Sequence, residues 1–150
     1  MKFDPEVNPI LEKISSIVSA DETRDFAFEK GVEFYSKQKF FEAHEIFEFQ
    51  WRKESGNMKL FQQALIQIAI SMNKVFVNIN LVGAKSQAEK AKSKLESLTT
   101  DLFFTEIGLQ FANGLIENLT QLIQILDSEI PNLSHYNERS FEKDWASLVI

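Results

Sequence analysis

Ionisable side chains that could do chemistry gather in one short stretch, between Phe40 and Arg52. It holds His44, one of only two histidines, with Glu48 one helical turn later and Glu45 between them. A carboxylate four residues after a histidine can orient and charge its imidazole, which suits general acid–base chemistry. Ionisable groups are costly to bury without a partner. The stretch is therefore either a core helix with a satisfied polar seam or the wall of a site.

His44 and Glu48 are also weak candidates for metal ligands. Their order looks like half of a zinc-protease motif, which needs two histidines one turn apart. Glu48 stands in place of the second histidine, and Glu45 is expected to project too far round the helix to join. A di-iron helix bundle needs a glutamate three residues before each histidine, where this chain has Phe41. A divalent metal here would need further ligands, and no nucleotide or flavin motif indicates another cofactor.

Composition restricts the class of protein. The chain has 150 residues, 44% of them hydrophobic and 25% charged, which is typical of one soluble globular domain. A net charge of −6 argues against a nucleic-acid partner, which usually needs a basic face. The absence of cysteine excludes disulfides, thiol nucleophiles and cysteine-based metal sites. No apolar run is long enough to span a membrane and the start lacks a signal core, so we expect a cytoplasmic protein with no membrane partner.

Apolar residues at helical spacing predict an all-α, single-domain bundle of about six helices. The third and fourth of these helices are expected at its centre. The predicted helices are about 8–18, 21–37, 40–54, 58–79, 81–98 and 105–128. They divide the chain into an N-terminal arm (1–20), a core (about 21–98), a long amphipathic helix (101–128) and a tail (129–150).

Local signals set the boundaries of these helices. Val18 is expected to extend the apolar stripe of the first helix, and Ser19 with Glu22 matches a capping box for the second. Gly56 is expected to end the third helix, and a turn is predicted at 99–101. Asn80 can cap the fifth helix.

The predicted fourth helix has no charged residue between Leu60 and Asn73, and it is apolar nearly all round, as a central helix should be. Its narrow polar stripe faces the His44–Glu48 row if the two helices pack together, so these rows are expected to pair. This arrangement predicts a small-molecule or metal-binding pocket between the third and fourth helices. Its candidate catalytic residues are His44, Glu45, Glu48 and Arg52. Its candidate ligand-binding residues are Trp51, Gln62, Gln63, Gln67, Lys74 and Asn80.

The alternative is a protein-interaction or structural module in which this polar seam is buried and stabilising. A lone histidine beside an apolar face is more often a satisfied core group than a catalyst, so the structural interpretation is favoured over catalysis. Leucines 115, 119, 122 and 126 form a stripe that suits core packing better than a dimer seam. A homo-oligomer that forms through the 105–128 helix or the tail is the other interpretation of these apolar residues. The apolar tail, with Phe141 and Trp145, is expected to dock on the body or on a partner.

The motif Glu42-Ala43-His44-Glu45, followed by Glu48 and then Trp51-Arg52, resembles domain-of-unknown-function family 309. The resemblance continues through Leu65-Ile66-Gln67, Asn80 and Gly83-Ala84, and covers about residues 26–98. It implies a small all-helical fold without an assigned activity. The shared polar positions are His44, Glu45, Glu48, Trp51, Arg52, Gln62, Gln67 and Asn80. Many members carry a histidine in the central helix where this chain has Asn73-Lys74, which weakens a two-histidine metal site.

A weaker resemblance is to a tetratricopeptide hairpin. Gly31, Phe34, Phe40, Ala43 and Phe47 fall near the small and large positions of that unit. The likeness implies hairpin packing and an interaction surface. Stacked repeats normally need at least about three units, and only one is present, so a repeat protein is not predicted.

Overall fold

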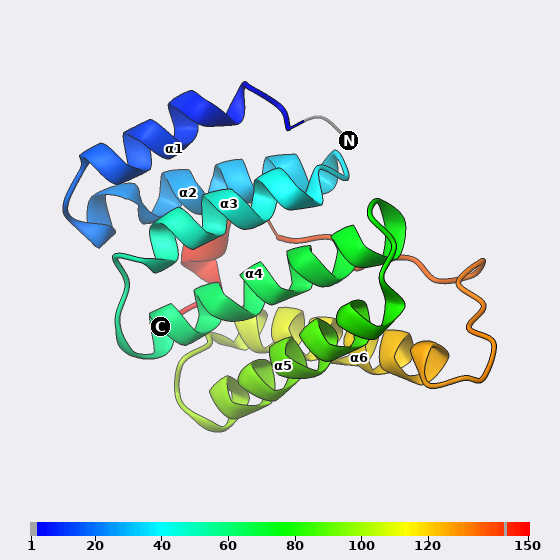
Figure 1. The fold of residues 1–150 in the computed structure, drawn as a ribbon. Helices are drawn as coiled ribbons and strands as arrows, with labels where there is room; N and C mark the ends of the chain where they lie inside the picture. Colours follow the sequence, from blue (N-terminus) through cyan, green and yellow to red (C-terminus); the bar gives the residue numbers. More distant parts are fainter. Residues whose placement is uncertain (1–2, 143) are drawn as a thin grey trace.

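The computed structural model describes residues 3–142 and 144–150, and in this part of the chain it contains only helices and loops, apart from one isolated β-bridge. The all-α, single-domain prediction is confirmed, with α3 and α4 in contact at the centre of the bundle (Figure 1). The elements are α1 (Val7–Ser16), α2 (Ala20–Ser36), α3 (Phe40–Trp51), α4 (Gly56–Phe76), α5 (Leu81–Thr100), α6 (Glu106–Leu126) and the short 3-10 helix η1 (Trp145–Ser147).

Three boundary predictions are wrong. Gly56 does not end the third helix, because α3 already stops at Trp51 and Gly56 begins α4 with a φ of 59°, a conformation that favours glycine. The turn expected at 99–101 starts only after Thr100, where α5 ends. Ser19 lies at the N-cap of α2, but its hydroxyl makes no capping hydrogen bond, so the capping box is not formed.

The buried face of α1 differs from the predicted one. Val7, Leu11 and Ile14 are buried, whereas Val18 is 92% exposed. The helix ends at Ser16 and the backbone then becomes extended at Ile17, so Val18 no longer follows the helical period. Its place in the apolar stripe is therefore wrong.

α3 lies between three other helices, because α1, α2 and α4 all pack against it. On its α2 side the ring of Phe47 fits against the bare Cα of Gly31, and a Cβ at that glycine would overlap the ring. Phe47 is fully buried and also contacts Phe28 of α2, with the ring centroids 6.3 Å apart. The two helices therefore approach each other closely at Gly31.

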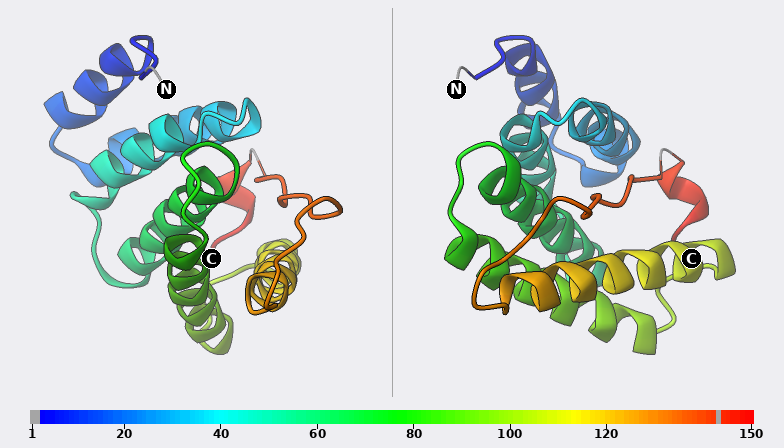
Figure 2. Two further views of the ribbon diagram at one scale, coloured as in Figure 1. Left: turned by 45° about the vertical axis from the view of Figure 1, so that its right-hand side comes forward. Right: turned by 90° about the vertical axis from the view of Figure 1, so that its right-hand side faces the viewer.

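The C-terminal tail docks on the body of the protein. From the end of α6 it runs back across the bundle towards α2 (Figure 2). The Phe141 ring stacks on Tyr35 of α2 at 3.9 Å and also meets Phe47 of α3 and Phe111 of α6. Further on, the Trp145 indole N–H donates to the Asp25 carboxylate of α2. The tail therefore fills the space between the first helices and α6.

α6 turns its leucine stripe inwards. Leu115, Leu119 and Leu122 are buried in the chain's own core, and Leu126 is partly buried. This placement favours core packing for the stripe. No helix in the described part of the chain has the length and apolarity needed to cross a membrane.

The contact between Gly31 and Phe47 predicts whether an alanine at position 31 stabilises or destabilises the protein. Alanine in a helix is favoured over glycine by about 1 kcal/mol, but overpacking a core costs about 1–3 kcal/mol. We therefore expect Gly31→Ala to lower the free energy of unfolding by up to about 2 kcal/mol in urea denaturation. Gly114→Ala in α6 is the matched control, because an added Cβ there meets only the movable side chain of Arg139 at 2.7 Å. It should be neutral or stabilising, and a loss equal to that of Gly31→Ala would contradict the packing argument.

The contacts of the tail predict that loss of the Phe141 ring destabilises the protein. Phe141→Ala removes a buried ring that touches three helices, and we expect it to lower the free energy of unfolding by about 3–5 kcal/mol. Ile150→Ala is the control, since that side chain is 80% exposed and should change stability by less than about 0.5 kcal/mol. Urea denaturation of both variants measures the difference. Equal stabilities for the two variants would show that the tail is not part of the core.

Candidate functional site

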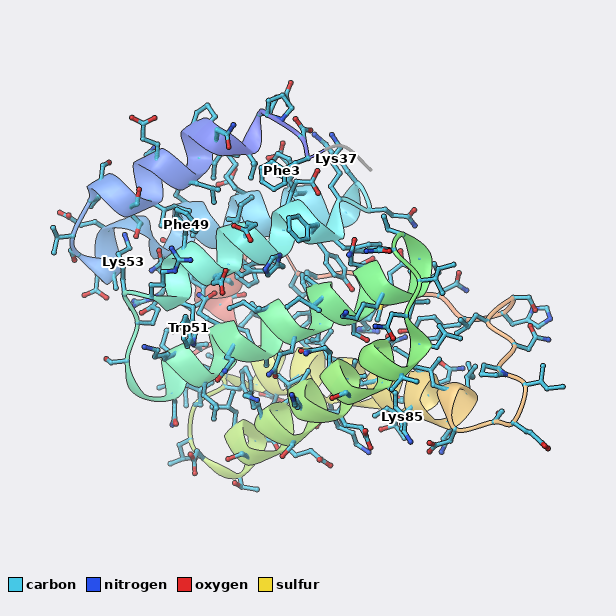
Figure 3. The ribbon with its side chains drawn as sticks, in the orientation of Figure 1. Phe3, Lys37, Phe49, Trp51, Lys53 and Lys85 are labelled. Atoms are coloured by element: carbon cyan, nitrogen blue, oxygen red, sulfur yellow. The ribbon has the colours of Figure 1, made fainter. Side chains whose placement is uncertain are left out.

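Three adjoining hollows follow the line between α3 and α4. The first, with a volume of about 140 Å³, lies between Glu48 and Trp51 on α3 and the glutamines of α4, and we call it the Trp51 hollow. The second, of about 240 Å³, contains His44 and Lys74 and is called the Lys74 hollow. The third, of about 360 Å³, lies beside Phe3 and is called the Phe3 hollow. Neighbouring hollows share lining residues, so we treat them as one α3–α4 groove. Phe3 and Trp51 lie at its opposite ends (Figure 3).

His44 lies in the middle of this groove with only 9% of its surface exposed. Its Nδ1 is 2.7 Å from the backbone oxygen of Phe41. Because a carbonyl oxygen can only accept a hydrogen bond, Nδ1 carries a proton and donates it. The other ring nitrogen, Nε2, lies 3.4 Å from Oε1 of Glu45 and 3.8 Å from Oε2 of Glu48. The expectation that Glu45 projects too far round the helix is therefore wrong.

This geometry sets an electrostatic condition on the site. One ligand atom from each of His44, Glu45 and Glu48 can be chosen so that all three lie within 4.8 Å of one another. With Nδ1 protonated, a neutral imidazole would point the Nε2 lone pair at two carboxylates, which is unfavourable. A cation between the three groups would remove this repulsion.

Trp51, the last residue of α3, and Arg52, which follows it, lie in different surroundings. The Arg52 side chain is 56% exposed, stands over the Phe49 ring at 4.6 Å and is 3.8 Å from Oε2 of Glu48. It belongs to the outer surface and lines none of the three hollows. Trp51 does line a hollow, and its buried indole N–H has no hydrogen-bond partner among the described residues. The Lys59 ammonium lies 4.5 Å from its ring centroid.

Across the groove, α4 contributes neutral amides. Gln63 and Gln67 line the Trp51 hollow together with Glu48, and Gln67 is 9% exposed with its Oε1 unpartnered. No hydrogen bond among the described residues joins these amides to the His44–Glu48 row. Ser71 instead donates to the backbone oxygen of Ala84 on α5, at 2.7 Å. The predicted pairing of the two polar rows is wrong, because a hollow separates them.

The remaining predicted ligand-binding residues lie in three different settings. Lys74 lines the same hollow as His44. Gln62 is fully buried inside the bundle and lines none of the three hollows. Asn80 caps α5, as expected, with its side-chain oxygen accepting from the N–H of Gly83 at 3.0 Å.

Sequence reasoning missed the N-terminal arm as part of the site. Glu42 is 2% exposed, and its Oε2 accepts from the backbone N–H of Asp4 at 3.0 Å. Lys39 donates to the Asp4 carboxylate. These contacts hold Phe3 against Phe41, with the ring centroids 5.8 Å apart, at one end of the groove. The only signal in the sequence was a glutamate within an aromatic run, which does not identify a partner from the arm.

A second polar network lies on the other side of α3, and it too was missed. The Lys53 ammonium donates to the backbone oxygens of Ile14 and Ile17 at 2.5 and 2.8 Å, where α1 ends. Burial lowers the pKa of Lys53. Arg24 of α2 binds the buried Glu54 carboxylate with two hydrogen bonds, of 2.7 and 2.5 Å. Gln50 bonds Glu54 as well, so this network ties α1 and α2 to the end of α3.

The fold and this groove define a small all-helical protein with a cluster of one histidine and two glutamates. Residues 28–87 match the family model described as Domain of unknown function (DUF309). The match confirms the resemblance, over a segment shorter than the predicted 26–98. It contains His44, Glu45, Glu48 and the α4 wall, whereas the N-terminal arm and the tail lie outside it. Comparisons with curated proteins and with solved structures gave no significant match.

The ion pair between Lys39 and Asp4 predicts that the docking of Phe3 depends on pH. The hydrogen bond from Lys39 holds the pKa of the Asp4 carboxyl below its ordinary value of 3.8. A lowered folded-state pKa gives a stabilising contribution that is complete above the ordinary value and is lost as pH falls through the folded value. We therefore expect the Phe3 ring signals in NMR spectra to keep their folded positions down to about pH 4 and to shift below it. In Lys39→Met they should be shifted already at pH 7, whereas Lys90→Met should behave as wild type.

Proposed function

We propose that the α3–α4 groove is a binding site whose centre is a divalent cation held by His44, Glu45 and Glu48. The observation that carries this proposal is the orientation of His44. Its Nδ1 is hydrogen-bonded to a carbonyl, while Nε2 faces two carboxylates. Histidines that ligate metals typically donate their other ring N–H in this way, which fixes the tautomer.

The two distances from Nε2 of His44 to the carboxylates support a small ion. In a tetrahedral zinc site with ligands at 2.0–2.1 Å, neighbouring ligand atoms are about 3.4 Å apart. The distances of 3.4 and 3.8 Å from Nε2 to the two carboxylates are near this value. Imidazole and carboxylate ligands suit zinc and similar first-row ions. Three protein ligands leave a coordination position open, which is the pattern of catalytic zinc sites.

The alternative, in which His44 and Glu48 belong to a buried stabilising seam, fits this cluster less well. A stabilising seam should satisfy its polar atoms, and the network around Lys53 and Glu54 does so with hydrogen bonds to α1 and α2. The groove instead contains buried polar atoms, on Trp51 and Gln67, that find no partner in the described part of the chain. These features support a site that holds a ligand beside the ion.

Zinc titration by calorimetry tests the proposal. We expect the wild-type protein, prepared without a histidine tag, to bind one Zn²⁺ per chain. His44→Ala and Glu48→Gln each remove a ligand, so they should weaken binding by at least the 10–100-fold typical of losing even an outer partner. Glu89→Gln is the matched control, since Glu89 is exposed on α5 and away from the groove.

Urea denaturation of the metal-free variants separates a site from a structural seam. If His44 and Glu48 serve the ion, both variants should stay within about 1 kcal/mol of the wild-type stability. A wild-type protein that binds no zinc, or variants that bind it as tightly as Glu89→Gln, would refute the proposal. Variants that unfold instead would favour the buried structural seam.

A further inference from the structure

Among the residues that the structure describes, Lys74 is the one lysine or arginine that lines the hollow of His44, and it is partly buried there. None of the acidic side chains in the described residues forms an ion pair with it. A partly buried charge without a partner is unfavourable, so an anion that enters this hollow gains a charge-assisted contact. Asn73 and Asn78 line the same hollow and can supply hydrogen bonds from their amides.

The charge of the neighbouring cluster limits the charge of this anion. A neutral His44, two ionised glutamates and a divalent cation together carry no net charge. Lys74 adds one positive charge in the hollow, while Arg52 beside Glu48 lies on the outer surface, where water screens its charge. The loaded groove therefore best complements a single negative charge. A carboxylate meets this requirement and can also occupy an open position on the ion.

The rest of the wall is apolar and aromatic. Phe41 lines both the Lys74 hollow and the Phe3 hollow and is 41% exposed, although it is a large apolar side chain. Phe3 meets it edge to face, and Val77 and Ile70 continue the apolar surface along α4. The combined space is large enough for a ring beside the charged group, and aromatic rings prefer such edge-to-face and offset contacts.

We infer that the α3–α4 groove binds a small monocarboxylate with an aromatic or other apolar body. Its carboxylate lies between Lys74 and the cation site, and its body lies against Phe41 and Phe3. This inference rests on the proposed cation site for the second contact of the carboxylate. Lys74 determines the charge of the ligand, and the two phenylalanines determine its shape.

Benzoate and benzamide form a matched pair of probes, because they share the ring and differ in charge. In calorimetric titrations of the zinc-loaded protein we expect benzoate to bind at least about tenfold more tightly than benzamide, and more tightly than acetate, which lacks the ring. Lys74→Met keeps the length of the side chain but not its charge, and should remove the preference for benzoate. Lys59→Met, on the same helix but over Trp51, is the control and should keep it.

The outcomes distinguish this inference from the proposed function. Lys74→Met should still bind zinc, since Lys74 is not a ligand of the ion. If zinc binds and benzoate shows no preference over benzamide, or if Lys59→Met loses the preference as well, the carboxylate inference is overturned and the cation site stands. If zinc does not bind but benzoate binding still depends on Lys74, the cation site is refuted and the carboxylate site stands. Melting temperatures of both lysine variants exclude a loss of fold.

Discussion

The fold depends on the contact between the ring of Phe47 and the bare backbone of Gly31, which sets how closely α2 and α3 approach. Phe47 is fully buried, and the same ring meets Phe141 of the tail. With this face of α3 fixed against α2 and the tail, residues a fraction of a turn away are directed towards α4. His44 and Glu48 occupy those positions. One steric constraint in the core therefore determines which side chains form the wall of the groove.

α3 carries two polar faces, and the difference between them is the main argument about function. One contains Gln50 and is followed by Lys53 and Glu54, whose charges are hydrogen-bonded to the neighbouring helices. The other contains His44 and Glu48, whose Nε2 and Oε2 atoms lie 3.8 Å apart, with Glu45, Arg52 and a hollow beside them. A buried charged network is retained when it is well paired. The first face fits that description, whereas the second is the face at which we propose that a cation binds.

Periodicity was enough to predict the helices and the central place of α3 and α4, because each depends on local spacing. Other features depend on contacts between distant segments. Gly56 was misassigned because a glycine with positive φ can end one helix or begin the next. Glu45 was misplaced because a helical projection ignores the reach of a long side chain. Lys53 could be understood only once the end of α1 was placed beside it.

The arm and the cluster are linked through Phe41. Its backbone oxygen accepts the hydrogen bond that fixes the tautomer of His44, and its ring forms the wall of two hollows. The arm presses Phe3 onto this ring, held by Glu42 and Lys39. A ligand lying against Phe41 would therefore contact the arm and the histidine at once. The arm lies outside the segment matched to DUF309. The cluster of His44, Glu45 and Glu48 therefore lies within that segment, while the aromatic end of the groove depends on residues outside it.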